Sequence, residues 1–205
     1  MFSFIIPTLG LSETFKILIN SLINHDHVKE VIIIDNSELG LNNLMPQSEK
    51  IMLIRNNDNN YVNPSWNQGY IQSTSKKLAI CNDDIIFDTR VLPWITKKLD
   101  KNIGIIGMSI KDFSNINSSF QDYVDYKLKK VYSRPLHFGE LMFLSRFNYS
   151  IIPDDLKIAC GDDYLFIKQL HSNYVVKGLT LKGETSKSSN LFRSTGIARS
   201  DKKSI

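Results

Sequence analysis

One short apolar segment of this chain ends in a cluster of residues that could do chemistry. Residues 78–81 are apolar and run directly into Asn82, Asp83 and Asp84. Adjacent carboxylates at the end of a buried strand repel each other and lose solvation, so they need a cation or solvent beside them. An open α/β sheet keeps its ligand site at the carboxyl ends of its strands. The cluster therefore predicts a ligand site near Asp84, although a strand that ends in a polar turn remains an alternative.

Two further acidic positions stand at the ends of expected elements. Asp35 follows the β-branched run 31–34, which is typical of a strand covered on both faces. Asp162 and Asp163 open the apolar segment 160–170, at a helix N-terminus, where the helix dipole favours the carboxylate anion. A carboxylate in that form can accept a proton from an attacking hydroxyl. Structural roles also stay open, with Asp35 as a turn residue and the paired acids as an ordinary helix start.

The elements that must position these residues alternate between strand and helix in the first half of the chain. Apolar runs predict strands over residues 2–6, 30–35, 50–55, 78–81 and 103–108, with helices over residues 12–24, from 63 to before 76, and 88–99. We expect Pro7 to end the first strand, and Asn63, Pro64 and Asp88 to start helices. Residues 109–137 show no clear period, and strands at 139–146 and 174–181 flank the helix at 160–170. This order predicts one α/β domain with a Rossmann-like, mostly parallel central sheet flanked by helices, and a smaller irregular second half.

Bulk composition narrows the function classes. The 205 residues suffice for one well-buried α/β domain, and the net charge of +4 lacks the dense basic, aromatic-studded face of a nucleic-acid binder. Basic residues gather after Leu181, and such a tail could meet phosphates or an anionic membrane surface. The two cysteines offer neither a disulfide framework nor a zinc spacing. We find no apolar run of membrane-spanning length and no signal peptide, so we expect a soluble, cytoplasmic protein.

The order of these motifs resembles that of the glycosyltransferases of the GT-A fold, in particular the family 2-like group that uses nucleotide-sugar donors. The resemblance covers residues 1–189, with a nucleotide-sugar-binding half at 1–108 and an acceptor and catalytic half at 109–189, and leaves 190–205 as a basic tail. It implies a hexosyltransferase-type enzyme that moves a sugar from a nucleoside-diphosphate sugar, with UDP as the expected nucleotide, to an acceptor hydroxyl. A single base and in-line displacement imply inversion at the sugar carbon.

The resemblance also implies roles for particular residues. Asp35 matches the family's acidic residue that hydrogen-bonds the nucleotide base. Asn82 takes the first position of the D-x-D motif and Asp84 the metal-binding one, so one of the usual carboxylates is missing. A Mg²⁺ or Mn²⁺ ion held there with the substrate phosphates would neutralise the leaving group. Glu184 stands about where many members supply a His to the metal.

The late acidic motif of the family matches Asp162 and Asp163. Asp163 takes the position of the general base, and we expect Asp162 to cap the helix. Further residues expected along the donor are Pro7, Thr8, Asn60, Asn67, Asn82 and Asp83.

Three other function classes remain open. A nucleotidyltransferase also binds a nucleotide through carboxylates and metal, but residues 7–10 lack the cationic, Gly-rich phosphate loop of that class. A phospho-acceptor signalling module with Asp35 as acceptor would leave the acidic pairs unexplained. A catalytically silent nucleotide-sugar binder is compatible with the missing first acid at Asn82. The acceptor, whether glycan, protein or lipid, is not indicated by any motif.

Overall fold

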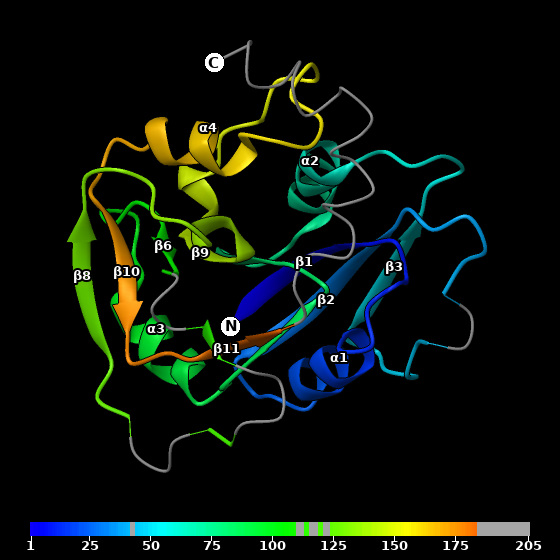
Figure 1. Cartoon of the computed structure of the whole chain (residues 1–205), viewed down its shortest axis with the longest axis horizontal. Coiled ribbons are helices and arrows are strands. Elements are labelled where there is room, and N and C mark those ends of the chain that lie inside the picture. Colours follow the sequence, from blue (N-terminus) through cyan, green and yellow to red (C-terminus); the bar gives the residue numbers. More distant parts are fainter. Residues whose placement is uncertain (42–43, 110–112, 115–118, 121–123, 184–205) are drawn as a thin grey trace.

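An eight-stranded sheet forms the centre of the molecule, with the strand order β3-β2-β1-β4-β9-β6-β10-β8 (Figure 1). The computed structural model describes residues 1–41, 44–109, 113–114, 119–120 and 124–183. The strands of this sheet are β1 (Phe2–Thr8), β2 (Val28–Asp35), β3 (Ile51–Arg55), β4 (Lys77–Cys81), β6 (Ile106–Gly107), β8 (Lys127–Val131), β9 (Leu141–Ser145) and β10 (Asn173–Lys177). A second, three-stranded sheet has the order β5 (Ile85–Phe87), β11 (Leu181–Gly183) and β7 (Phe113–Ser114).

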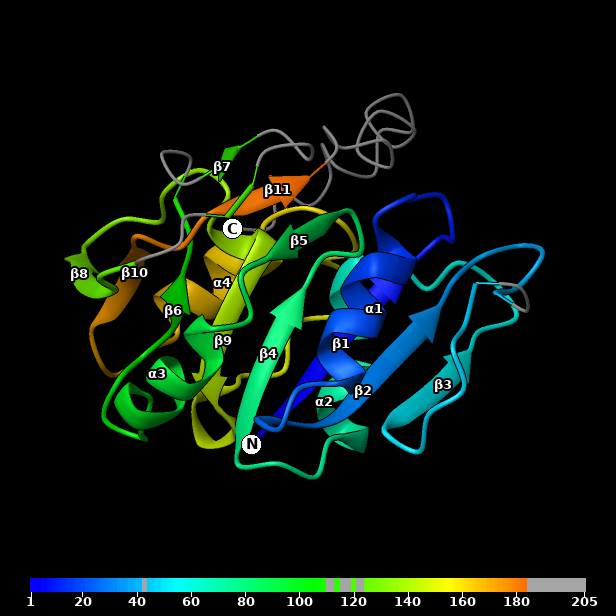
Figure 2. The same ribbon diagram turned by 90° about the horizontal axis from the view of Figure 1, so that it is seen from below.

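Most neighbouring strands of the first half run in the same direction. β1 pairs in parallel with β2 and β4, and β2 pairs in parallel with β3. The arrows of β2, β3 and β4 accordingly point the same way in Figure 2. β9 is antiparallel to β4 and β6, and β8 is antiparallel to β10. The prediction of a Rossmann-like, mostly parallel sheet in a single α/β domain is therefore confirmed.

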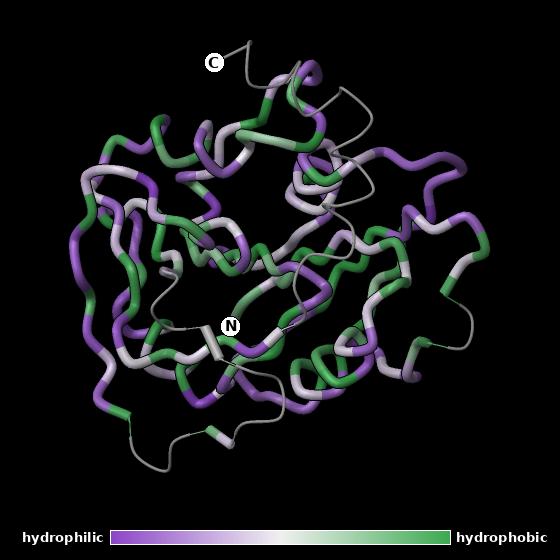
Figure 3. The backbone as a smooth tube through the Cα atoms, in the orientation of Figure 1, coloured by the Kyte–Doolittle hydropathy of each residue, from purple (hydrophilic) through white to green (hydrophobic). Residues whose placement is uncertain are grey.

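Helices cover both faces of this sheet. They are α1 (Phe15–Ile23), α2 (Val62–Gln72), α3 (Val91–Lys98) and α4 (Gly161–Ile167), with short 3-10 turns η2 (Phe138–Glu140) and η3 (Arg146–Asn148). Alternate residues of β1 enter two separate cores: Phe4 packs with residues of α1 and α3, and Ile5 packs with residues of α2 and α4. Hydrophobic stretches accordingly run through the interior in Figure 3. Within the described residues, no helix combines the length and the apolar character needed to cross a membrane.

Two expected element boundaries are wrong, and each has a local cause. β1 continues through Pro7 to Thr8, because Pro7 still pairs in register with Ile34 and the Thr8 carbonyl accepts a bond from the Asn36 N–H. Helix α2 begins at Val62, one residue before the expected cap. The Asn63 side-chain amide instead donates to two carbonyl groups of the segment before α4. Asn63 therefore makes tertiary contacts and does not cap the helix.

The second half contains elements that the sequence did not predict. β8 lies within residues 109–137, which were expected to be irregular, and it pairs with β10 at the sheet edge. The single strand expected at 174–181 is split between the two sheets, with Gly178 in the left-handed region (φ +84°) at the break. Of the expected strand at 103–108, β6 keeps two residues. Glu184 and the basic tail lie outside the described residues.

Candidate functional site

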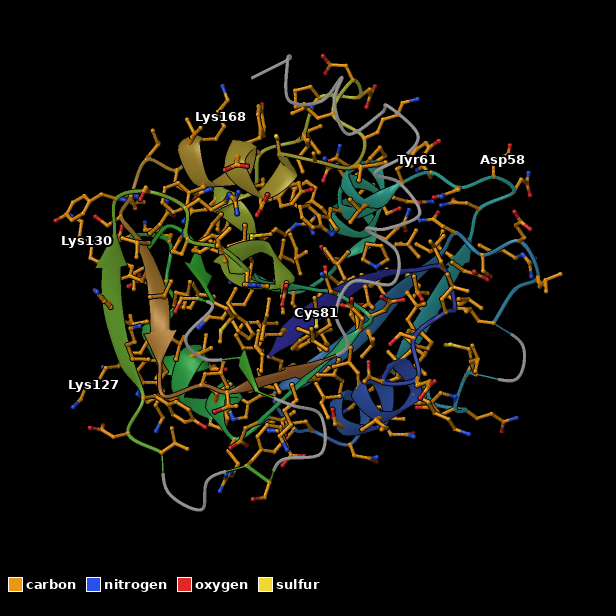
Figure 4. The ribbon with its side chains drawn as sticks, in the orientation of Figure 1. Asp58, Tyr61, Cys81, Lys127, Lys130 and Lys168 are labelled. Carbon is orange, nitrogen blue, oxygen red and sulfur yellow. The ribbon has the colours of Figure 1, made fainter. Side chains whose placement is uncertain are left out.

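A cavity of about 330 Å³ lies at the carboxyl ends of the central strands. Because β1, β2 and β4 are parallel, their carboxyl ends reach the same edge of the sheet. In Figure 4, Cys81 marks the end of β4 and Tyr61 marks the start of α2. The polar residues that line the cavity come from both halves of the chain, and they include Thr8, Asn36, Asn59, Asn82, Asp83, Asp84, His137, Glu140 and Asp162.

The loops after β1 and β4 hold each other in place. The Thr8 hydroxyl donates to the Asp83 carboxylate and accepts a bond from the Gly10 N–H at 2.9 Å. The Thr14 hydroxyl donates to the Asp83 carbonyl at 3.2 Å. Gly10 has φ +72°, a backbone conformation that residues with a Cβ rarely adopt. The structure thus brings Thr8 and Asp83 to the cavity wall, and Pro7, Asn82 and Asp84 line the same cavity.

Asp35 ends β2, is fully buried and is not among the residues that line the cavity. Its Oδ1 accepts bonds from the Ser37 N–H at 2.9 Å and from the Ser37 hydroxyl at 2.5 Å. Its Oδ2 has no hydrogen-bond partner among the described residues. A buried acceptor without a partner is costly, so a ligand N–H would stabilise it. The next residue, Asn36, lines the cavity and donates to Ser65.

Asn60 and Asn67, which were also expected along the donor, have different surroundings. The Asn60 N–H donates to Asn36 Oδ1 at 3.3 Å, and the residues on either side of Asn60 line the cavity. Asn67 is buried in α2, where its Oδ1 accepts bonds from the Tyr149 hydroxyl and the Ile152 N–H. Its amide donates to the Ile152 carbonyl. The Asn67 side chain therefore ties the two halves together and does not line the cavity.

The paired acids of α4 share one arginine. Arg134 Nη1 lies 3.0 Å from Asp162 Oδ2, and Arg134 Nε donates to Asp163 Oδ1. Burial raises the pKa of Asp162, and the charge of Arg134 opposes that rise. Asp162 lines the cavity, whereas Asp163 is not among its lining residues. The N-cap of α4 is Cys160 and has no side-chain cap bond, so the expected capping role of Asp162 is wrong. The partly exposed Arg134 and the Asp163 N–H, at 3.1 Å from Oδ1, contact this carboxylate instead.

A histidine and a glutamate complete the cavity, and sequence reasoning missed both. His137 Nδ1 bonds Glu140 Oε1, while Glu140 Oε2 is buried without a partner among the described residues. Burial raises the pKa of Glu140, and the bond to His137 partly offsets that rise. The Asn82 N–H donates to the Glu140 carbonyl at 2.9 Å, so the pair lies beside the end of β4. One sequence signal was available: an acidic residue directly before a fully buried strand.

Backbone strain is concentrated around this cavity. Among the described residues, the non-glycine residues with positive φ are Tyr61 (60°), His137 (63°) and Cys160 (61°). Tyr61 and His137 line the cavity, and Cys160 directly precedes α4. Such conformations cost about 1–3 kcal/mol each and cluster at functional sites. This distribution supports the view that the cavity is the functional site.

The donor set of the cavity suits a divalent cation that is shared with a substrate. In the described part of the chain, no group of three or more His, Cys, Asp and Glu residues is arranged to hold a metal ion. Asp83 and Asp84 nevertheless present carboxylates to the cavity, and Mg²⁺ or Mn²⁺ completes such a shell with water and substrate phosphates. β11 ends at Gly183, opposite Ile85. The second predicted metal ligand, Glu184, follows Gly183 in the sequence and is itself not described.

The fold and the cavity together define a class of protein. The GT-A fold has three features that this structure shares: a parallel Rossmann-like half, an acidic cluster after its fourth strand, and a second half that closes the cavity. Residues 3–169 match the sequence profile described as Glycosyl transferase family 2. The chain therefore belongs to glycosyl transferase family 2. No protein with a curated description matches the sequence significantly.

Solved structures agree with this fold assignment. The structure of S. aureus TarS residues 1–349 has a TM-score of 0.62 at 14% identity, over 97% of this chain and 64% of that one. The same TarS fragment in complex with UDP-GlcNAc gives a TM-score of 0.60 at 14% identity, over 91% and 60% of the two chains. GalNAc-T7 with UDP, GalNAc and Mn²⁺ gives 0.65 at 12% identity, over 89% and 43%. This chain thus spans less than two thirds of the length of these structures.

Proposed function

We propose that this protein is a metal-dependent glycosyltransferase that moves a sugar from a UDP-sugar to an acceptor hydroxyl. The observation that carries the proposal is the cavity at the strand ends, where Asp83 and Asp84 of the first half meet Asp162 of the second. Family membership supports the reaction class. UDP-GlcNAc in TarS and UDP with Mn²⁺ in GalNAc-T7 support the choice of donor and metal.

Asp84 is the proposed metal ligand, with Glu184 as a second candidate. A bound Mg²⁺ or Mn²⁺ would supply positive charge to the diphosphate as it leaves. Thr8 fixes the neighbouring Asp83 by a hydrogen bond, which keeps the loop after β4 in one conformation before a donor arrives. A preorganised loop lowers the ordering cost of binding.

Asp35 is proposed to recognise the base of the nucleotide. Its buried Oδ2 can accept a bond from a ring N–H of the kind that uracil carries. The bonds from Ser37 to Oδ1 hold the carboxylate in one orientation. Asn36 and Asn59 line the cavity beside it, so the base would enter between the loops after β2 and β3.

The general base is proposed to lie in the Asp162 and Asp163 pair. The carboxylate takes the proton of the acceptor hydroxyl, the hydroxyl oxygen forms a bond to the sugar C1, and the C1–O bond to the diphosphate breaks. UDP leaves with the electron pair, and the configuration at C1 inverts. The motif position favours Asp163, whereas the cavity wall holds Asp162. Arg134, bonded to both, keeps the two carboxylates oriented.

A catalytically silent UDP-sugar binder is the second candidate. Two observations favour it: Asn82 replaces the first acid of the motif, and the described residues hold no three-ligand metal group. Such a protein would bind donors but release no nucleotide.

Turnover separates the two candidates. We would measure UDP release from UDP-glucose, UDP-galactose, UDP-GlcNAc and UDP-GalNAc with Mn²⁺, with and without pooled glycan acceptors. The transferase account expects release from at least one donor, and loss of that release in Asp163→Asn or Asp162→Asn. Donor binding with no release under any condition would leave the silent binder as the correct account.

A further inference from the structure

Glu140 lines the cavity between the loop after β4 and the acidic pair of α4. In the proposed reaction the sugar lies between the diphosphate at Asp84 and the acidic pair of α4. The segment of Gly139 and Glu140 reaches both ends of this interval. At one end the Glu140 carbonyl accepts a bond from the Asn82 N–H at 2.9 Å. On the other side, a Cβ added to Gly139 would lie 2.6 Å from Asp162 Oδ2, so Asp162 packs directly against the Gly139 backbone.

The Glu140 carboxylate is held but not fully satisfied. His137 engages Oε1, and the left-handed backbone of His137 (φ 63°) places its ring for this contact. Oε2 is buried, with no partner in the described part of the chain. A buried carboxylate oxygen without a donor costs free energy that a ligand hydroxyl would recover. The side chain is 19% exposed and lines the cavity, so a bound sugar is within its reach.

Trp66 supplies the complementary group. It lines the same cavity from α2, it is 4% exposed, and its indole N–H has no partner among the described residues. A buried indole N–H normally finds an acceptor. Two residues of the cavity wall thus carry unsatisfied groups, an acceptor on Glu140 and a donor on Trp66. A sugar hydroxyl both donates and accepts, so hydroxylated ligands match this pair.

The charge of the cavity limits which sugars fit. Among its described lining residues four are carboxylates, Asp83, Asp84, Glu140 and Asp162, and one, His137, is basic. A divalent cation and the diphosphate would offset the charges near Asp84. Arg134 offsets the charge of Asp162, so Glu140 is the carboxylate that would act on the sugar. A second anionic group placed beside Glu140 would be repelled, and like charges in contact within a desolvated site are strongly unfavourable.

We propose that Glu140, held by His137, makes this site selective for neutral nucleotide sugars by binding a sugar hydroxyl and excluding donors whose sugar carries a carboxylate. This inference rests on the proposed function, since it assumes that a UDP-sugar occupies the cavity. It adds a specificity-determining residue, Glu140, and a substrate class, neutral hexoses.

Two matched donor pairs test the proposal. UDP-glucose and UDP-glucuronate differ at C6 alone, as do UDP-galactose and UDP-galacturonate. We would measure the Kd of all four and of UDP by calorimetry with Mn²⁺, for the wild type, Glu140→Gln and Asp125→Asn. Asp125 is an exposed carboxylate that pairs with Lys127, so its variant controls for loss of one negative charge.

The wild type and Asp125→Asn should bind the neutral member of at least one pair about ten- to a hundredfold more tightly than the uronate, because the uronate carboxylate and Glu140 would repel each other at close range. Glu140→Gln should narrow this gap to within about threefold and leave UDP affinity unchanged. Equal affinities for neutral and uronate donors in the wild type would overturn the proposal, even if Glu140→Gln failed to fold. An undiminished gap in a folded Glu140→Gln would overturn it too. Should UDP itself fail to bind the wild type, the proposed function would fall, and this inference with it.

Discussion

Arg134 offers a prediction that can be worked through from the structure. Its guanidinium contacts Asp162 and Asp163, and the three side chains are 25%, 19% and 30% exposed. Arg134→Met keeps the length of the side chain but leaves two adjacent carboxylates without their cation. We expect this variant to lose stability at neutral pH and to lose much less in acid.

The magnitude follows from the burial of the cluster. Breaking a buried ion pair costs about 3–5 kcal/mol, whereas exposed pairs contribute about 0–1 kcal/mol. Partial exposure places the loss for Arg134→Met at about 1.5–3 kcal/mol near pH 7.5.

The pH dependence follows from the carboxyl groups. Burial already raises the pKa of Asp162 above its ordinary value of 3.8, and Arg134 opposes that rise. Without Arg134 the pKa of Asp162 rises further. Ionisation of a carboxyl with a raised folded-state pKa lowers stability as pH increases from the ordinary value through the raised one. Near pH 4 the protonated carboxyl needs its cation less, so the loss is smaller.

Urea denaturation at about pH 4 and about pH 7.5 measures both quantities. Lys127→Met is a matched control, because Lys127 pairs with Asp125 at side-chain exposures of 71% and 60% and should cost under about 1 kcal/mol at either pH. The reasoning would be refuted by an Arg134→Met variant that loses the same free energy at both pH values, or no more than the control.

Three further predictions concern the site and the sheet beneath it. Asp163→Asn should keep UDP-sugar affinity and lose about 10²–10⁴-fold in the single-turnover transfer rate, which is the usual contribution of a positioned base. The same measurement on Asp162→Asn shows which carboxylate takes the proton. The assignment of the base to this pair fails if both variants retain wild-type rates. Because adenine lacks the ring N–H that Asp35 needs, ADP should bind about 1–3 kcal/mol more weakly than UDP by calorimetry, and equal affinities would contradict the role of Asp35. Gly69→Ala should destabilise the fold by about 1–3 kcal/mol in urea, since its Cβ would lie 2.3 Å from Ile5 Cγ2, and an unchanged midpoint would count against this packing.

The first half of the fold could be predicted because its signals are local. The unbroken β-branched run before Asp35 requires burial on both faces, which in turn requires a parallel sheet with helices above and below. β8 could not be predicted, because Lys127, Lys129 and Lys130 interrupt any alternation. Its pairing with β10 is long-range and leaves one edge exposed to solvent, where lysines are common.

The candidate site divides in a similar way. Asp83 and Asp84 were predictable because they stand just after a buried strand, with Asn82 between. Arg134 and His137 come from the segment without periodicity, and Glu140 stands at the start of a predicted strand. Their place in the site depends on contacts with Asp162, Asp163 and Asn82, which are distant in the sequence. Spacing carries no information about such contacts, so the structure was needed to place these residues in the site, and only Glu140 left a signal in the sequence.

A separate tertiary effect explains the wrong role given to Asn63. Asn before Pro is a standard helix-start pattern, but the Asn63 side chain bonds the carbonyl groups of Leu156 and Ala159. A Cβ on Gly161 would lie 2.1 Å from Asn63 Oδ1, so Asn63 packs tightly against the first turn of α4. The residue therefore joins the two halves of the domain.

Calorimetric titration of UDP tests the central claim most directly. The account predicts that Mn²⁺ strengthens UDP binding to the wild type by at least about tenfold and that a chelator reverses this gain. Asp84→Asn keeps the shape of the side chain but loses its charge. This variant should still bind UDP weakly but show no gain in affinity with Mn²⁺. UDP affinity that is the same with and without Mn²⁺, or a metal effect that survives intact in Asp84→Asn, would contradict a metal-assisted UDP site at the end of β4.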